Sequence, residues 1–374
     1  MNSQRQQMRK IAVPIIAVIL GLLAGALIML IFGYQPIAGY GSLLKGAFGS
    51  MRSFGEVLRQ ATPLIFTAIG FMVASSAGFF NIGLSGQALA GWVASIWMAL
   101  AFPDLPKAIL LPACILVGAL AGAIAAFVPG FLRAFFGTSE VIVTIMMNYI
   151  ILYSSTYILQ NVWPEAYRTS VDSSIMVSEN ASLRVLGLSQ LFGGSRVNMG
   201  LILALIALVI IWVIIRKTTL GFEIRAVGLN PFASENAGMS SKRTIIISMI
   251  LSGVFAGLGG VVEGLGTYQN FFVQTTNLSI GFDGMAVSLL GAGAPIGILL
   301  AAILFSALQI GGLNMQTGAG VPFEIVSIII ALILLFVAIS YLVEKGLDKV
   351  TSLHKDHDQK SSSQGTAKDE GGID

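Results

Sequence analysis

Residues 11–32 of the chain read IAVPIIAVILGLLAGALIMLIF, an uninterrupted run without a charged side chain. An α-helix rises ~1.5 Å per residue, so a run of this length spans the ~30 Å hydrocarbon layer of a bilayer. The run is too long for the apolar core of a signal peptide, and no convincing cleavage site accompanies it. It therefore predicts a retained first membrane helix.

The composition of the whole chain is that of a membrane protein. Of its 374 residues 55% are hydrophobic and 10% are charged, and the mean hydropathy is +0.85. A soluble domain carries roughly a quarter charged residues, which it needs to cover a water-facing surface. The net charge of +3 does not indicate nucleic acid as a partner, because the basic residues sit at the ends of apolar runs, where they orient membrane helices.

Similar apolar runs recur along the chain. Together they predict an all-α membrane protein, a polytopic bundle of about ten transmembrane helices. The eighth run is short, so we expect some helices to be short or broken and buried in protein. The expected spans are Ile11–Phe32, Thr62–Gly78, Gly86–Phe102, Ile109–Leu132, Val141–Leu159, Met199–Ile215, Thr244–Val262, Phe282–Gly293, Ile296–Leu313 and Phe323–Leu342.

The distribution of lysine and arginine predicts the orientation. When the segments between spans are assigned to alternate sides of the membrane, the side that holds both termini has twice as many lysines and arginines as the other. Cytoplasmic segments carry the excess of basic residues, so both termini should be cytoplasmic. Segment 33–61 fits less well, because three basic residues fall on its outer side. We expect a transmembrane domain over 1–349, with a cytoplasmic loop at 216–243 and a long external loop at 160–198. Residues 350–374 are polar and predict a disordered cytoplasmic tail.

Several kinds of catalytic site are absent from the sequence. There is no G-x-x-x-x-G-K-[ST] phosphate loop, nucleophile elbow, H-E-x-x-H motif or metal-ligand cluster, and the single cysteine, Cys114, excludes an internal disulfide. An enzyme is therefore not expected. Charges in apolar regions are few and near span ends, namely Glu140, Glu263, Asp283 and Glu324. This disfavours a proton relay and suits an uncharged solute that is driven from outside the membrane.

The first polar cluster, Phe79 to Gln87, lies between the second and third spans. Glycines let the backbone bend there, while Asn81 and Gln87 each offer hydrogen-bond donors and acceptors. Aromatic rings such as Phe79 and Phe80 beside amides suit a flat polar ligand. The alternative is a tight interhelical turn whose amides satisfy loose backbone groups. The residues alone leave both interpretations open.

A second polar set lies on one face of the fifth span, where Glu140, Thr144 and Asn148 are spaced four residues apart. Glu140 falls in the first helical turn, where the helix dipole favours an acid, so a helix-cap role competes with a ligand or gating role. Asn148 lies in mid-span and needs partners. It is a candidate for the pore lining or for a bond between helices.

A third segment, Arg225 to Gly238, predicts a short cytoplasmic helix. Asn230 is suited to the N-cap, Pro231 to the first helical position and Gly238 to the end. Such a helix between two spans is a good lever for a partner protein. The alternative, a helix lying on the membrane surface, has too weakly apolar a face to be preferred.

Small residues recur at four-residue spacing in several runs. They are Gly21 and Gly25, Gly118 and Gly122 with Ala126, Gly253 and Gly257, and Gly260 and Gly264. In a bilayer such stripes let helix backbones approach closely. We expect compact packing from them and no further role.

The three polar segments resemble, in order and spacing, motifs of ABC-importer permeases. The matching stretches are Phe80–Gly83 with Gly86-Gln87, Gly137–Tyr149, Arg225–Gly228 with Asn230 and Gly238, and Gly281–Val287 with Ala294–Gly297. The resemblance is to the branched-chain amino acid and simple-sugar permease superfamily, in particular its nucleoside-uptake permeases, and runs from the first span to the last. One departure is Ser85, where similar sequences usually carry glutamate.

The resemblance implies a bacterial cell-membrane complex. Its partners would be a second homologous permease subunit, a cytoplasmic ABC ATPase that uses the ATP, and an extracellular solute-binding lipoprotein; this chain would bind no cofactor. The expected substrate path comprises Phe79, Phe80, Asn81, Gln87, Thr144, Asn148, Phe282 and Asp283, with Glu140 as gate or helix cap. The residues expected to couple to the ATPase are Arg225, Gly228, Asn230, Pro231, Phe232 and Glu235.

Other functions compete with nucleoside import. The same type of complex could carry a simple sugar such as ribose, which shares the polar edge of a nucleoside. An ion- or proton-coupled secondary transporter would work without an ATPase. A non-transporting membrane scaffold has no specific support.

Overall fold

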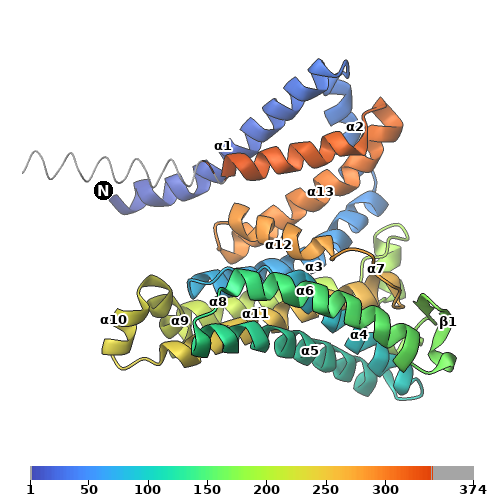
Figure 1. Cartoon of the computed structure of the whole chain (residues 1–374). Helices are drawn as coiled ribbons and strands as arrows, with labels where there is room; N and C mark the ends of the chain where they lie inside the picture. The colour runs from blue at the N-terminus through green and yellow to red at the C-terminus, as the bar shows by residue number, and fades with distance from the viewer. Residues whose placement is uncertain (1, 338, 340–374) are drawn as a thin grey trace, which may run out of the picture. The chain divides into compact units, whose positions relative to one another are not determined.

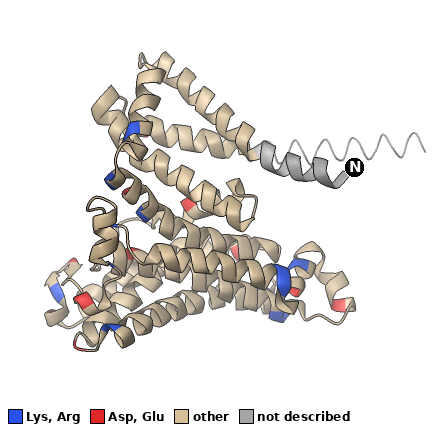
Figure 2. Cartoon of the chain, turned by 180° about the vertical axis from the view of Figure 1, so that it is seen from behind, with Lys and Arg blue, Asp and Glu red and all other residues tan. Residues whose placement is uncertain are grey.

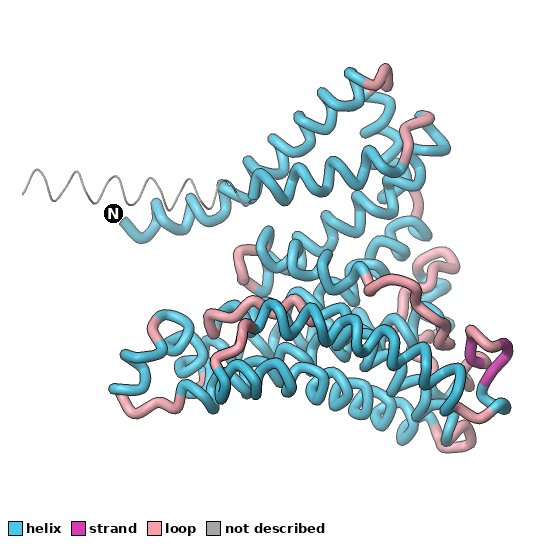
Figure 3. The backbone as a smooth tube through the Cα atoms, viewed as in Figure 1, coloured by secondary structure: helices cyan, strands magenta, loops and turns pink. Residues whose placement is uncertain are grey.

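The structure is a computed structural model that describes residues 2–337 and residue 339, with side chains from residue 14 onward. It is helical almost throughout, apart from one small antiparallel pair of strands, β1 (Arg168–Ser170) and β2 (Ser173–Ser174) (Figure 3). The tail predicted at 350–374 and the end of the tenth predicted span lie outside the described residues.

The α-helices follow one another along the chain as shown in Figure 1. They are α1 (Asn2–Ile31), α2 (Pro36–Phe48), α3 (Met51–Ser76), α4 (Leu84–Ala101), α5 (Lys107–Phe136), α6 (Glu140–Tyr157), α7 (Leu186–Leu191), α8 (Gly200–Lys217), α9 (Thr219–Leu229), α10 (Pro231–Asn236), α11 (Ser241–Val261), α12 (Ser279–Leu290) and α13 (Pro295–Ala319). A further apolar helix covers Phe323–Val337. Two π-helical turns, η1 (Ile158–Val162) and η4 (Val262–Tyr268), extend α6 and α11, and two 3₁₀ turns, η2 (Glu165–Tyr167) and η3 (Glu179–Ala181), lie in the long loop.

Eight of the described helices are long and apolar enough to cross a membrane. Two shorter apolar helices, Ser279–Leu290 and Phe323–Val337, complete the set. Each of the ten predicted spans overlaps one of these segments, and the eighth is short as expected. The all-α polytopic bundle is thus confirmed, while the number of crossings and the side of the termini remain predictions.

The chain divides into two compact units, which are described separately. The first consists of Met1–Ile28 with Ser327–Asp374, and in it Gly21 of α1 lies against the backbone of Ile333. The second, Met29–Val326, contains the polar motifs. At its centre is α3, whose most apolar stretch is 89% buried. This helix contacts α11, α12 and α13. The charged residues of this unit lie mostly toward the ends of its helices (Figure 2).

The start of α3 differs from the prediction by eleven residues. The helix begins at Met51 instead of Thr62, and Ser50 caps it by accepting a hydrogen bond from the Ser53 N–H at 3.0 Å. Polar residues lowered the hydropathy of this first part, yet Arg59 is buried because Glu56 pairs with it at 2.7 Å. Arg59 is therefore a helix residue and does not belong to a loop. The helix α2 was also not predicted from hydropathy.

The small-residue stripes pack as predicted. A Cβ atom on Gly257 of α11 would lie 2.6 Å from the Gly118 carbonyl oxygen of α5, and one on Gly122 would overlap the Gly253 carbonyl. Any side chain here would collide with backbone. The glycines therefore allow α5 and α11 to touch along their backbones.

Candidate functional site

The first polar cluster forms a sharp connection between α3 and α4. Asn81 is completely buried there, and its amide nitrogen donates to Gln87 Oε1 at 3.0 Å and to Ser252 Oγ at 2.8 Å. Its amide oxygen accepts from the Gly83 N–H at 2.9 Å and from Gln87 Nε2 at 3.1 Å. In this conformation the two amides thus satisfy each other and hold the turn onto α11.

The polar face of α6 joins the same turn. Thr144 and Asn148 share a face of α6, as their spacing predicted, and both are buried; Ser155, further along the helix, is buried as well. Asn148 Oδ1 accepts from the Gly86 N–H at 2.8 Å, and Asn148 Nδ2 donates to the Ile82 carbonyl at 2.9 Å. One side chain of α6 therefore satisfies two backbone groups where the connection enters α4. For Asn148 the sequence left open a place in the pore lining or a bond between helices, and in this structure Asn148 makes the second.

The predicted gate residue Glu140 lies in the first turn of α6. It pairs with Arg133 of α5 at 3.4 Å, and the Arg133 guanidinium lies 5.8 Å from the centre of the Phe79 ring. This ion pair links the end of α5 to the start of α6. Phe80 is 43% exposed and meets Phe71 edge to face at 4.9 Å.

The residues predicted on the eighth span lie in α12. Phe282 is exposed, whereas Asp283 Oδ2 accepts a hydrogen bond from Gln309 Nε2 at 3.1 Å. Gln309 Oε1 in turn accepts from Gln60 Nε2 at 3.1 Å. Asp283 is therefore connected through two glutamines to α3, and not directly to the amide cluster.

Ser85, the departure from similar sequences, lies against the start of α12. Its hydroxyl donates to the Leu278 carbonyl at 2.8 Å, and a Cβ atom on Gly281 would overlap the Ser85 side chain. Ser85 is only 1% exposed, so its small side chain is enclosed where α12 comes close to α4.

The predicted coupling segment consists of two helices, α9 and α10. Asn230 Oδ1 caps α10 by accepting from the Ala233 N–H at 3.1 Å, Pro231 opens the helix, and Gly238 follows its end with φ +85°. This confirms the short helix predicted there. Phe232 is 79% exposed, and Arg225 and Glu235 are exposed as well.

Gly228 connects this segment to the membrane bundle. A Cβ atom on Gly228 would overlap the Ser76 carbonyl oxygen, and one on Gly78 would lie 3.3 Å from Gly228 Cα. The last turn of α9 is therefore in backbone contact with the end of α3, directly before the connection that carries Asn81. A displacement of α9 would act on that connection without an intervening side chain.

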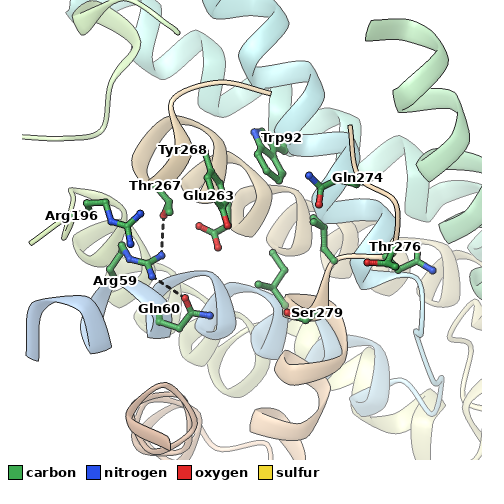
Figure 4. A pocket seen from close by; sticks show the side chains of 13 residues that line it. Arg59, Gln60, Trp92, Arg196, Glu263, Thr267, Tyr268, Gln274, Thr276 and Ser279 are labelled. Atoms are coloured by element: carbon green, nitrogen blue, oxygen red, sulfur yellow. Dashed lines mark hydrogen bonds between the residues drawn. The ribbon is translucent and has the colours of Figure 1, made fainter. Parts of the chain in front are cut away.

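A cavity of about 330 Å³ lies elsewhere in the same unit, and the sequence did not predict it. Its walls come from α3, α4, η4, the loop before α8 and the strand-like connection to α12 (Figure 4). The residues that line it are Arg59, Gln60, Trp92, Arg196, Glu263, Thr267, Tyr268, Gln274, Thr276, Asn277, Leu278, Ser279 and Ile280.

An ion-pair network forms one wall of this cavity. Arg59 Nε donates to Glu56 Oε2 at 2.7 Å, and Arg196 from the long loop donates to the same oxygen at 3.1 Å. The remaining Arg59 nitrogens donate to Gln60 Oε1 and Thr267 Oγ1. Arg184 donates to the Gly266 and Thr267 carbonyls nearby. The pKa of Arg184 is lowered, mainly because the guanidinium is partly buried and also because the like charge of Arg196 is close.

Aromatic rings form the opposite wall. Tyr268 stacks on Trp92 with ring centres 5.1 Å apart and planes at 13°. Trp92 is buried and fixed, because its indole N–H donates to the Asn270 carbonyl at 2.9 Å and its ring meets Phe271 and Phe272 edge to face. Tyr268 is 40% exposed and belongs to the cavity wall.

The long loop 160–198 closes over this end of the bundle. Its backbone pairs with the segment after η4, through hydrogen bonds from the Ser174 N–H to the Phe271 carbonyl and from the Val177 N–H to the Gln269 carbonyl, both at 2.8 Å. A signal for the cavity was present in the sequence. Glu56, Arg59 and Gln60 are spaced by three and four residues, which places three polar side chains on one helical face.

Replacing Asn148 by alanine should destabilise the turn between α3 and α4. The Gly86 N–H and the Ile82 carbonyl would each lose a partner, and an unpaired buried polar group costs roughly 1–3 kcal/mol. The thermal unfolding midpoint of the purified chain should fall, while Ser155→Ala on the same face should change it little. An unchanged midpoint together with an altered preference among solutes would show instead that Asn148 contacts the solute.

Comparison with known proteins identifies relatives over nearly the whole chain. Residues 53–338 match the family described as branched-chain amino acid transport system / permease component. The nucleoside ABC transporter permease protein NupB of Lactococcus lactis is 52% identical over 347 residues, covering 92% of this chain and 95% of NupB. The guanosine ABC transporter permease protein NupP of Bacillus subtilis is 47% identical over 345 residues, covering 92% and 98%.

More distant relatives are also permeases of ABC transporters. The glucose ABC transporter permease protein TsgB13 of Haloferax volcanii is 32% identical over 87% of both chains. Lactococcus lactis and Bacillus subtilis each also have a second permease homologue, 26% and 28% identical over 67% of this chain. No solved structure matches. Permeases of ABC transporters thus occur as several homologous chains in one organism.

Proposed function

The chain belongs to the family of branched-chain amino acid transport system permease components, and from this premise we propose that it forms the translocation path of an ATP-driven importer of nucleosides. The observation that carries the proposal is the pair of relatives that transport nucleosides or guanosine, which are 52% and 47% identical over 92% of the chain. The glucose permease relative, at 32%, lies further away.

Family membership makes the chain a transport subunit, not an enzyme. Its long apolar helices make it a multi-pass protein of the cell membrane. ATP hydrolysis would belong to a separate cytoplasmic ABC ATPase, since the sequence has no phosphate-binding loop. The further partners would be a second homologous permease subunit and an extracellular solute-binding lipoprotein. The second permease homologue in each of the two bacteria supports a pair of different permease chains.

The coupling proposal rests on α9 and α10. Phe232 and Leu229 are exposed by 79% and 88% in a segment that is proposed to be cytoplasmic, where a partner protein can cover them. Gly228, in the same segment, touches the end of α3. A motion of the ATPase against α10 would therefore reach the connection between α3 and α4. The energy of coupling would arise as a difference in affinity of the ATPase for two states of the permease.

The predicted substrate path is retained as a proposal. Its amides fill the connection between α3 and α4 in this conformation, so they would form a closed part of the path that the coupling segment can open. The proposed residues are Phe79, Phe80, Asn81, Gln87, Thr144, Asn148, Phe282 and Asp283, with Glu140 as a gate through its pair with Arg133.

Uptake in cells tests the proposed substrate class. Cells that lack this chain should take up labelled guanosine and uridine much more slowly than cells in which the chain is restored. Excess unlabelled nucleoside should compete, and excess ribose should not. Competition by ribose alone would favour the sugar permease, and uptake that persists without ATP and stops when the ion gradient is dissipated would favour a secondary transporter.

Phe232→Asp should separate ATP hydrolysis from uptake. The exposed ring would be replaced by a charge on the surface that is proposed to enter the ATPase, so docking should weaken by roughly 1–3 kcal/mol or more. We expect the subunits to be present in the membrane, with uptake reduced at least tenfold or with the ATPase released on purification. Leu186→Asp, equally exposed on the loop before α8, is the matched control and should transport normally. Normal uptake by Phe232→Asp would place the coupling site elsewhere.

A further inference from the structure

Two buried oxygen atoms without a hydrogen-bond partner line the same cavity. Among the described side chains, Glu263 Oε2 and Asn277 Oδ1 are both buried and unpaired, and both residues belong to the cavity wall. Glu263 as a whole is only 6% exposed. Buried acceptors normally find donors within the protein. Two unsatisfied acceptors on residues of one cavity wall indicate that a small rotation of either side chain would meet a ligand that brings hydrogen-bond donors.

The backbone directs Glu263 into this position. It lies in η4, the π-helical turn that continues α11, and π-helical turns often occur at functional sites because they shift side chains out of the regular register. In Figure 4 the Glu263 carboxylate points toward the space between Tyr268, Arg59 and Ser279. The described ion pair of Arg59 is with Glu56, and its other hydrogen bonds go to Gln60 and Thr267. Arg59 therefore does not neutralise Glu263 by direct contact.

The cavity wall carries groups of both signs, so an ion of either sign would meet a like charge as well as an opposite one. A phosphate group would be attracted by the arginines but would lie beside the acidic side chain of Glu263. A cation would face the guanidinium groups of Arg59 and Arg196, which line the same cavity. A neutral molecule rich in hydroxyl or N–H donors avoids both conflicts. It can donate to Glu263 and Asn277 while accepting from the polar groups beside them.

The aromatic wall adds a second requirement. Tyr268 is held flat against buried Trp92, and 40% of its surface is exposed. A fixed, partly open ring is a platform on which a nucleobase can stack. The volume of about 330 Å³ lies within the ~300–1,000 Å³ range of sites for small organic ligands.

We propose that this cavity is the nucleoside-binding site of the permease, in which ribose hydroxyl groups donate hydrogen bonds to Glu263 and Asn277 and the base stacks on Tyr268. The inference rests on the proposed function and extends it to a defined site and a mode of recognition. The long loop borders the proposed site, because Arg196 holds it at the cavity edge through its pair with Glu56 at 3.1 Å.

The test uses the complete complex in proteoliposomes and measures KM for labelled uridine and guanosine. 2′,3′-Dideoxynucleosides, which lack the donating hydroxyls, serve as competitors. The unmodified complex should prefer the ribonucleoside by tenfold or more. Glu263→Gln should raise KM for ribonucleosides roughly ten- to a hundredfold and should reduce the preference over the dideoxy compounds. Tyr268→Leu should raise KM for both kinds of nucleoside and leave the preference in place.

Matched controls keep the test specific. Glu179→Gln removes an exposed acid from the long loop, and Tyr153→Leu removes an exposed tyrosine from α6; both should retain the unmodified KM and preference. Asn277 lies in the connection before α12, outside the helices. If the complex does not assemble with Glu263→Gln, the same KM and preference measurements are made with Asn277→Leu.

The outcomes separate the two proposals. A complex that takes up no nucleoside at all would overturn the proposed function. A complex that takes up nucleosides, with KM and ribose preference unchanged in Glu263→Gln or in its substitute Asn277→Leu, would overturn the cavity as the binding site alone. Loss of the ribose preference in either variant, with the controls unaffected, supports the site.

Discussion

Replacing Gly228 by valine should abolish coupled transport while leaving the membrane bundle folded. Gly228 is the point at which α9 touches the last turn of α3, and a side chain there would overlap the Ser76 carbonyl oxygen. The overlap is with backbone, so it can be relieved only by moving α9 away from α3. Overpacking of this kind typically costs ~1–3 kcal/mol, which corresponds to roughly ten- to a hundredfold in a conformational equilibrium.

The measurement compares ATP hydrolysis with uptake in the reconstituted complex. For Gly228→Val we expect the ATPase to hydrolyse ATP without stimulation by solute, with uptake reduced to roughly a tenth or less. Gly187→Val is the matched control, because a Cβ atom at Gly187 meets nothing within 4 Å. Normal coupled uptake by Gly228→Val would show that α9 does not transmit the motion through this contact.

Replacing Gly257 by leucine should prevent the chain from folding. A Cβ atom there would lie 2.6 Å from the Gly118 carbonyl oxygen and 3.1 Å from Gly122 Cα, and Gly91 of α4 is packed on Gly257 from another direction. Three helices therefore meet at one glycine, and a branched side chain of four carbons would force them apart. The expected loss is more than about 3 kcal/mol, at the upper end for overpacking because no flexible side chain can give way.

The amount of monodisperse protein after detergent extraction reports this effect. Gly257→Leu should yield little or none, whereas Gly41→Leu, at an exposed position of α2 with nothing within 4 Å, should extract like the unmodified chain. A stable, monodisperse Gly257→Leu protein would mean that α5 and α11 are not packed backbone to backbone.

The sequence was sufficient to predict the helices that depend on local chemistry. Apolar runs located ten segments of the bundle, and the cap formed by Asn230 and Pro231 located α10. The glycine stripes predicted close backbone packing, which the structure shows between α5 and α11. These features are local or periodic, so they are visible without knowledge of which helices are neighbours. The start of α3 was missed because buried Glu56 and Arg59 look like loop residues until their ion pair is known.

The candidate cavity could not be predicted in the same way. It joins Arg59 to Glu263 and Thr267, which are about 200 positions further along the chain. Glu263 was noticed as a charge near the end of a span, but Trp92 was an ordinary member of an apolar run and Tyr268 fell outside every predicted span. Which residues face a common space depends on the packing of α3 against α11, and hydropathy carries no information about that pairing.

The role of the amides shows a second limit of sequence reasoning. Asn81, Gln87 and Asn148 can hydrogen-bond either a solute or the backbone, and the residue types are identical in both cases. In the structure Asn81 and Gln87 bind each other, and Asn81 also binds Ser252 and the Gly83 N–H. Asn148 binds only the backbone of Ile82 and Gly86. Whether a solute replaces these bonds during transport stays a prediction, which the Asn148 variant addresses.

The most direct test of nucleoside import is accumulation in proteoliposomes that contain this chain, its partner permease and the ATPase, with the solute-binding lipoprotein supplied outside. Labelled guanosine and uridine should accumulate only when ATP is enclosed with the ATPase, and omission of this chain should remove the accumulation. Accumulation of ribose in place of nucleosides, or nucleoside accumulation driven by an ion gradient without ATP, would contradict the proposed function.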